Sequence, residues 1–70
     1  MLKYGMLVLT PDGMGTIKGF ERFDQYGKSL PLSLEDTPNS GSRVAIELEN
    51  NPYSFSPAYY YRGQIDASSV

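Results

Sequence analysis

The clearest fold signal of this chain lies at residues 5–21, with the sequence GMLVLTPDGMGTIKGFE. The apolar run over residues 5–10 has the composition of a β-strand, and the proline, acid and glycine at residues 11–13 are typical of a turn. Residues 14–23 continue as a second run, in which internal glycines would weaken a helix. The stretch therefore predicts two strands joined by a turn.

The second strand is expected to be long and bent. Gly15 and Gly19 lie inside it, and glycines inside a strand commonly mark a bulge or a sharp bend. We place Ile17 on one face and Phe20 on the other, because side chains alternate along a strand. A small barrel uses such a bend to coil one strand into both of its sheets.

The glycines near the turn also invite comparison with phosphate-binding loops. Rossmann and Walker loops place their glycines between a strand and a helix, so that the helix N-terminus faces the phosphate. The residues after Gly15 predict a strand here, which leaves no such helix. We therefore interpret Gly13 as a turn residue with a positive φ.

Residues 24–42, DQYGKSLPLSLEDTPNSGS, are rich in turn formers and are expected to form a long loop between strands 2 and 3. Within this loop Leu30, Leu32 and Leu34 alternate at the period of a strand with one apolar face. Pro31 restricts such a strand to a sheet edge. The leucines either fold over one open end of the barrel or form an exposed arm for an oligomer contact or for strand addition.

The rest of the chain predicts two further strands and a short end. Residues 43–49, RVAIELE, alternate between a core face and a solvated face, and residues 58–62, AYYYR, follow a loop. After a glycine break, Ile65 is the natural inward anchor of a short final segment. Residues 67–70 are expected to be frayed.

This order of elements suits a single all-β domain, residues 1–70, folded as a five-stranded SH3-like barrel. The stretch 5–21 resembles the opening of Tudor- and KOW-type barrels, where a Gly-x-x-Val segment leads into a Pro-x-Gly-x-Gly-x-Ile turn. It is similar to the RNA-polymerase-interacting domains of the CarD and transcription-repair coupling factor families, and to the C-terminal Tudor domain of UvrD-type helicases. The resemblance implies core positions at Val8, Ile17 and Ile65 and turn or bend positions at Gly13 and Gly15.

The composition excludes several kinds of site. The 70 residues include no cysteine and no histidine, so disulfides, thiolate metal sites and a histidine base are all excluded. Glu47 and Glu49 have a structural explanation as the solvated side of an amphipathic strand. We therefore expect no enzyme, no metal site and no cofactor.

Charge and hydropathy bear on partners and location. A formal net charge of −2 is far from the basic surface of a typical nucleic-acid-binding protein. Lys18 and Arg22 would share a strand face and form a small basic patch. The first apolar run is broken by Pro11 and is too short for a signal peptide or a membrane span. We therefore expect a cytoplasmic protein that does not bind a membrane.

Aromatic residues give the best indication of function. In a strand, Tyr59 and Tyr61 share one face while Tyr60 takes the other. The alternative is that most of the tyrosines are half-buried barrel residues whose hydroxyls reach the surface. A partner-binding face is expected from Tyr53, Phe55, Tyr59, Tyr61 and Arg62.

Three functions remain open at this point. The first is a non-catalytic protein-binding module: an adaptor, a regulator or an inhibitor, including a phage or mobile-element accessory protein that acts on a bacterial host or transcription-related protein. The second is nucleic-acid binding through aromatic stacking. The third is a small-molecule or nucleotide-binding protein with a pocket at a subunit interface. A homo-oligomer is expected in each case, because the leucines and tyrosines provide more apolar area than one small barrel can bury.

Overall fold

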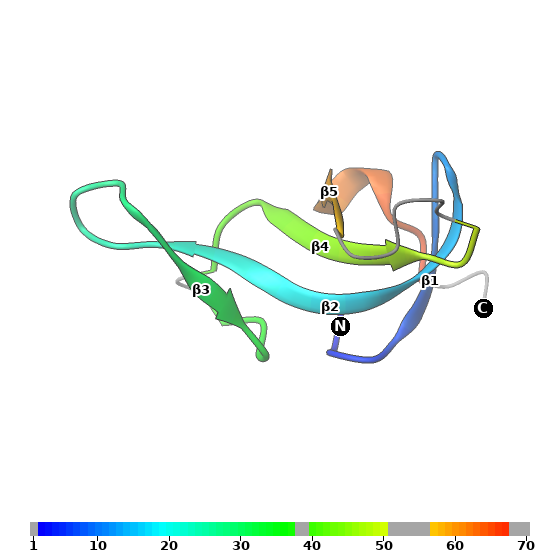
Figure 1. The fold of residues 1–70 in the computed structure, drawn as a ribbon, viewed down its shortest axis with the longest axis horizontal. Helices are drawn as coiled ribbons and strands as arrows, with labels where there is room; N and C mark the ends of the chain where they lie inside the picture. The colour runs from blue at the N-terminus through cyan, green and yellow to red at the C-terminus, as the bar shows by residue number, and fades with distance from the viewer. Residues whose placement is uncertain (1, 38–39, 51–56, 68–70) are drawn as a thin grey trace.

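A computed structural model describes residues 2–37, 40–50 and 57–67, and its fold is all-β as expected (Figure 1). The strands are β1 (Leu7–Thr10), β2 (Gly13–Phe23), β3 (Ser29–Ser33), β4 (Arg43–Leu48) and β5 (Ala58–Tyr61), followed by the 3-10 helix η1 (Arg62–Gln64). No helix in the described ranges is long and apolar enough to cross a membrane.

The strands form one antiparallel sheet with the order β1-β2-β4-β5, and β3 pairs with β2 outside this path. β2 therefore pairs with three neighbours and organises the molecule. One isolated bridge joins β1 to the segment after η1: Leu9 N donates to the Asp66 carbonyl at 3.0 Å, and Asp66 N donates to the Leu9 carbonyl at 2.9 Å.

The expected long loop at residues 24–42 contains the strand β3, where the leucine alternation lies. β3 pairs with the end of β2 in the register Arg22↔Leu30 and Phe23↔Ser29. The segment folds back as a hairpin because a five-residue turn brings its two halves together. Pro31 lies in a strand that pairs on one side, as expected for an edge position.

The turn between β1 and β2 confirms the interpretation of residues 11–13. Gly13 has a φ of +115°, and Thr10 Oγ1 donates to the Gly13 carbonyl at 2.8 Å and accepts from Asp12 N at 3.1 Å. β2 begins at Gly13, so a strand follows the turn where a phosphate-binding loop would need a helix.

The expected placement of Ile17 and Phe20 on opposite faces of β2 is wrong. The register between β2 and β4 shifts between Ile17 and Gly19, and both Ile17 and Phe20 are fully buried in one core cluster. A β-bulge adds one residue to a strand and so reverses the alternation beyond it. The glycine signal predicted the bulge, but not its effect on the faces.

The core consists of six buried side chains and a ring of partly buried ones. Ile65 is partly buried against this core, in agreement with its expected role. Ala67 also packs there, so the expected frayed end does not begin at residue 67; residues 68–70 lie outside the described residues. The buried members are Val8, Ile17, Phe20, Val44, Ile46 and Tyr60.

Candidate protein-binding face

Tyr59 and Tyr61 lie on the outer face of β5, as the alternation predicted. Their exposed fractions are 43% and 58%, whereas Tyr60 points into the core and is only 6% exposed. The Tyr60 hydroxyl donates to Asp12 Oδ2 at 2.6 Å and so ties β5 to the turn between β1 and β2. Burial of the hydroxyl is the main cause that raises the pKa of Tyr60, and the hydrogen bond to Asp12 raises it further. The three consecutive tyrosines therefore divide into one structural residue and two surface residues.

Arg43 on β4 neighbours both exposed tyrosines. It is the register partner of Tyr61 on β4, and its guanidinium carbon lies 5.1 Å from the centroid of the Tyr59 ring. A cation held over an aromatic ring is attracted by the negative face of the ring. Arg43 thus joins Tyr59 and Tyr61 in one surface.

Glu21 on β2 holds Arg43 in place. Arg43 Nε donates to Glu21 Oε1 at 2.9 Å, and Nη2 donates to Oε2 at 2.5 Å, which is the two-pronged geometry of a strong arginine–carboxylate pair. The hydrogen bond from Arg43 lowers the pKa of Glu21, although desolvation acts in the opposite direction. We name Glu21, Arg43, Tyr59 and Tyr61 the tyrosine face. Glu21 and Arg43 were not expected in the site, because only the strand register brings them together.

Arg62, which was expected on the partner-binding face, is engaged within the chain. Its guanidinium donates to both carboxylate oxygens of Asp36, at 2.5 and 2.8 Å, and to the Gly41 carbonyl at 3.0 Å. It also lies 5.7 Å from the centroid of the Phe20 ring. Arg62 therefore holds the chain before β4 against the core. Tyr53 and Phe55 lie outside the described residues.

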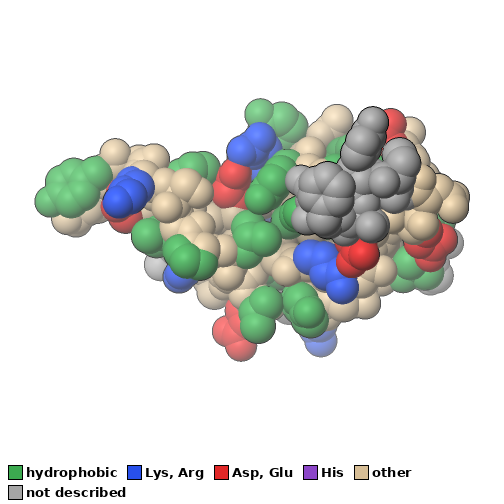
Figure 2. Space-filling model, viewed as in Figure 1, with side chains coloured by type: hydrophobic (Ala, Val, Ile, Leu, Met, Phe, Trp, Pro, Cys, Tyr) green, Lys and Arg blue, Asp and Glu red, His purple; other side chains and the backbone are tan. Residues whose placement is uncertain are grey.

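Lys18 and Arg22, the two residues of the expected basic patch, contact different neighbouring strands. Lys18 Nζ lies 3.2 Å from Glu47 on β4, and Arg22 Nε donates to the Pro31 carbonyl on β3 at 3.3 Å. Figure 2 shows basic and acidic side chains interspersed over the visible surface. This distribution leaves no extended surface of one sign on that face to follow a phosphate backbone.

The three leucines of the expected arm lie outside the core cluster. Leu30 and Leu32 are half-buried, and Leu34 is 62% exposed. Leu32 packs over Gly19, where an added Cβ would lie 2.8 Å from Leu32 Cβ. The three leucines therefore differ in their surroundings: Leu32 packs against β2, and Leu34 is open to water.

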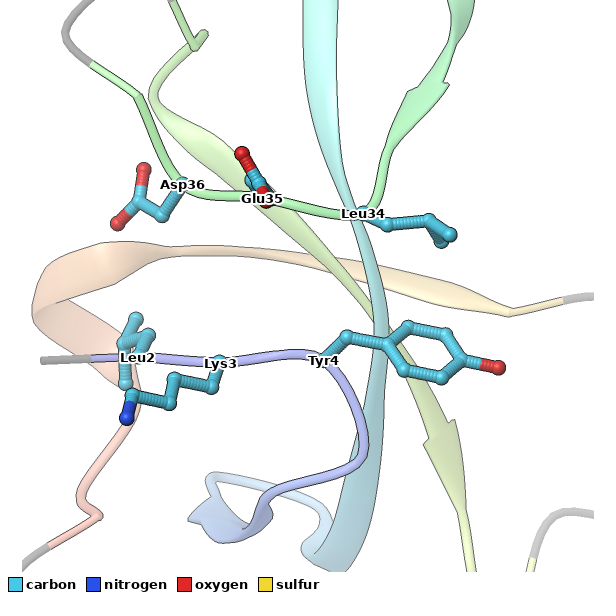
Figure 3. Close-up of a pocket in the computed structure, with 6 residues that line it drawn as sticks. All are labelled: Leu2, Lys3, Tyr4, Leu34, Glu35 and Asp36. Atoms are coloured by element: carbon cyan, nitrogen blue, oxygen red, sulfur yellow. The ribbon is translucent and has the colours of Figure 1, made fainter.

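A groove of about 420 Å³ lies beside Leu34 (Figure 3). Two chain segments, residues 2–4 and 34–36, run side by side along it, and the side chains of Tyr4 and Leu34 point to the same side. Sequence patterns do not indicate this groove, because its walls are 30 residues apart in the chain and neither wall is a helix or a strand. Within the described ranges, no three acidic, histidine or cysteine side chains are grouped as metal ligands.

Comparisons of the chain with protein-family models, with curated proteins and with solved structures find no match.

Proposed function

We propose that this protein is a non-catalytic binding module that recognises a protein partner through the tyrosine face. The observation that carries the proposal is the pairing of exposed Tyr59 and Tyr61 around Arg43. Tyrosine and arginine are the residue types most enriched in binding hot spots, together with tryptophan. They meet here on the outer face of a two-stranded ladder.

The internal support of Arg43 favours recognition of a protein. An arginine that is already held by Glu21 and lies over an aromatic ring loses less side-chain freedom when a partner binds. Tyrosine has only two side-chain torsions and presents a large surface at low entropic cost. The ion pair also satisfies the charge of Arg43 in advance, which suits a mainly apolar contact over the rings.

The proposed fold of this module is an SH3-like barrel in the cytoplasm. The Leu9–Asp66 bridge supports it, because it brings the segment after η1 to the edge of β1 away from β2. In this proposal that segment takes the place of the closing strand. The resemblance to the Tudor- and KOW-type domains then suggests a transcription-related protein as the partner, in a bacterial cell or in a phage-infected host.

The test is affinity capture from a nuclease-treated bacterial lysate, with stoichiometry read by mass spectrometry. The wild-type chain is compared with the double variant Tyr59→Ala/Tyr61→Ala and with Tyr26→Ala, a control that removes a tyrosine with 85% exposure from a distant turn. We expect the double variant to lose the captured protein by more than about tenfold, and the control to retain it.

Two results would contradict this proposal. Equal capture by the double variant and the wild type would exclude the tyrosine face. Recovery that disappears with nuclease and falls steeply with salt would indicate nucleic-acid binding instead. Circular dichroism of each variant shows whether the fold is retained.

A further inference from the structure

The turn between β2 and β3 is a hydrogen-bonded tip that presents a single tyrosine. Figure 1 shows this turn at one end of the long axis of the molecule. Tyr26 is 85% exposed there. Asp24 Oδ1 accepts from Tyr26 N at 2.8 Å and from Lys28 N at 2.9 Å, and Gly27 N donates to the Asp24 carbonyl at 3.0 Å with a φ of +81° at Gly27. These bonds fix the backbone beneath an aromatic side chain that has no place in the core.

The groove between residues 2–4 and 34–36 offers a surface of the opposite kind. Tyr4 and Leu34 are 52% and 62% exposed, which leaves an apolar wall open to water. Pockets that bind small organic groups have volumes of about 300–1,000 Å³. The groove, at about 420 Å³, is therefore large enough to take one tyrosine side chain.

The charges around the tip and around the groove are complementary. Lys28 flanks Tyr26 at the tip, and Glu35 lines the groove; both are exposed, and no ion pair of either is found among the described residues. Asp36 is already bound to Arg62, which leaves Glu35 as the acidic group available in the groove. Lys3 on the other wall likewise matches the acidic Asp24 of the tip.

We propose that the Tyr26 tip of one copy of this chain inserts into the groove of a second copy. In this contact Tyr26 packs against Tyr4 and Leu34, and Lys28 faces Glu35. The contact is between copies, because the tip lies at one end of the long axis, away from the segments 2–4 and 34–36 that line the groove (Figure 1). It uses neither Tyr59 nor Tyr61, so the proposed partner face remains free in the assembly.

Charge reversal tests the contact directly. The molar mass of the untagged full chain is measured by sedimentation over a range of concentrations, for Lys28→Glu, for Glu35→Lys, for the double variant and for an equimolar mixture of the two single variants. Each single variant places like charges together in every contact, whereas the mixture and the double variant restore opposite charges. Tyr26→Ala removes the ring, and Tyr61→Ala serves as the matched tyrosine control.

We expect the wild type to exceed the monomer mass of 7.8 kDa as its concentration rises. Each single charge variant should weaken association by about tenfold or more, and the mixture and the double variant should recover most of this loss. Tyr26→Ala should have the molar mass of a monomer, while Tyr61→Ala should associate as the wild type does.

A wild-type chain that stays monomeric at several hundred micromolar would overturn the proposal. So would a mixture that associates no better than its components, or an assembly that Tyr61→Ala disrupts and Tyr26→Ala does not. The last result would move the interface to the tyrosine face. Capture of a partner by that face tests the proposed function separately, so the two proposals can fail independently.

Discussion

At the scale of single residues, the Glu21–Arg43 pair shows how this small protein supports a charged group on its surface. Glu21 is only 8% exposed, whereas the Arg43 side chain is about two-fifths exposed. A buried carboxylate loses hydration, and the two hydrogen bonds from the guanidinium replace the lost hydrogen bonds to water. The pair therefore links the stability of β2 and β4 to the position of Arg43 over Tyr59.

This pair predicts a pH dependence of stability. The pKa of Glu21 is lowered from its ordinary value of 4.5, so its contribution to the free energy of unfolding is present above that value and is lost as the pH falls through the folded-state pKa. We expect Glu21→Gln to be less stable than the wild type at neutral pH, with a difference that narrows at acid pH. Urea denaturation between pH 7 and pH 3 measures the difference in free energy of unfolding between the two proteins. A constant difference over that range would show that ionisation of Glu21 does not contribute to stability.

At the scale of elements, the bulge in β2 is the decisive feature. Gly19 lies so close to Leu32 that an added Cβ would lie 2.8 Å from Leu32 Cβ, and this neighbour is the rigid base of a side chain. A Cβ added at Gly15 would likewise lie 2.5 Å from Ile46 Cγ2. The glycines thus allow β3 and β4 to approach β2 from its two sides.

We expect Gly19→Ala to destabilise the protein by about 1–3 kcal/mol, because the extra methyl group forces the β2–β3 pair apart. Gly63→Ala is the matched control, since no atom lies within 4 Å of its added Cβ. Thermal or chemical denaturation should show a clear loss for the first and little change for the second. A Gly19→Ala variant that is as stable as the wild type would show that the close approach to Leu32 does not require glycine.

The sequence allowed most elements to be predicted, but not the contacts between them. Local composition and alternation were enough for β1, β2, β4 and β5, for the turn at Gly13 and for the opposite faces of Tyr59 and Tyr60. The shared core position of Ile17 and Phe20 could not be predicted, because it depends on the position of the bulge in the pairing of β2 with β4. The Glu21–Arg43 pair and the groove depended on registers and crossings between segments that are far apart in the chain.

At the scale of the whole molecule, β2 and β4 form its centre, and the β2–β3 hairpin extends from it (Figure 1). The fully buried side chains of Ile17, Phe20, Val44 and Ile46 all lie on the central pair of strands. Local opening is governed by how many buried contacts an element makes. Stability should therefore decrease from the central pair toward the hairpin turn.

Native-state hydrogen exchange measures this gradient. We expect the slowest exchange in the β2–β4 ladder and faster exchange in the β2–β3 hairpin. The amides of Leu9 and Asp66 should be protected at the level of the β1–β2 ladder, because each donates across the bridge. Rapid exchange at both amides would remove the main support for a barrel that closes between β1 and the segment after η1.

The pairing of β2 with three strands also restricts how this sequence can diverge. A residue in the middle of β2 must suit neighbouring strands on both edges as well as the core, whereas a residue at the hairpin turn or on the outer side of β3 meets few such demands. Substitutions should therefore accumulate at the hairpin turn and on the outer side of β3, while the spacing Gly15-x-Ile17-x-Gly19-Phe20 persists. Distant relatives of this protein would share that short spacing before they shared overall identity.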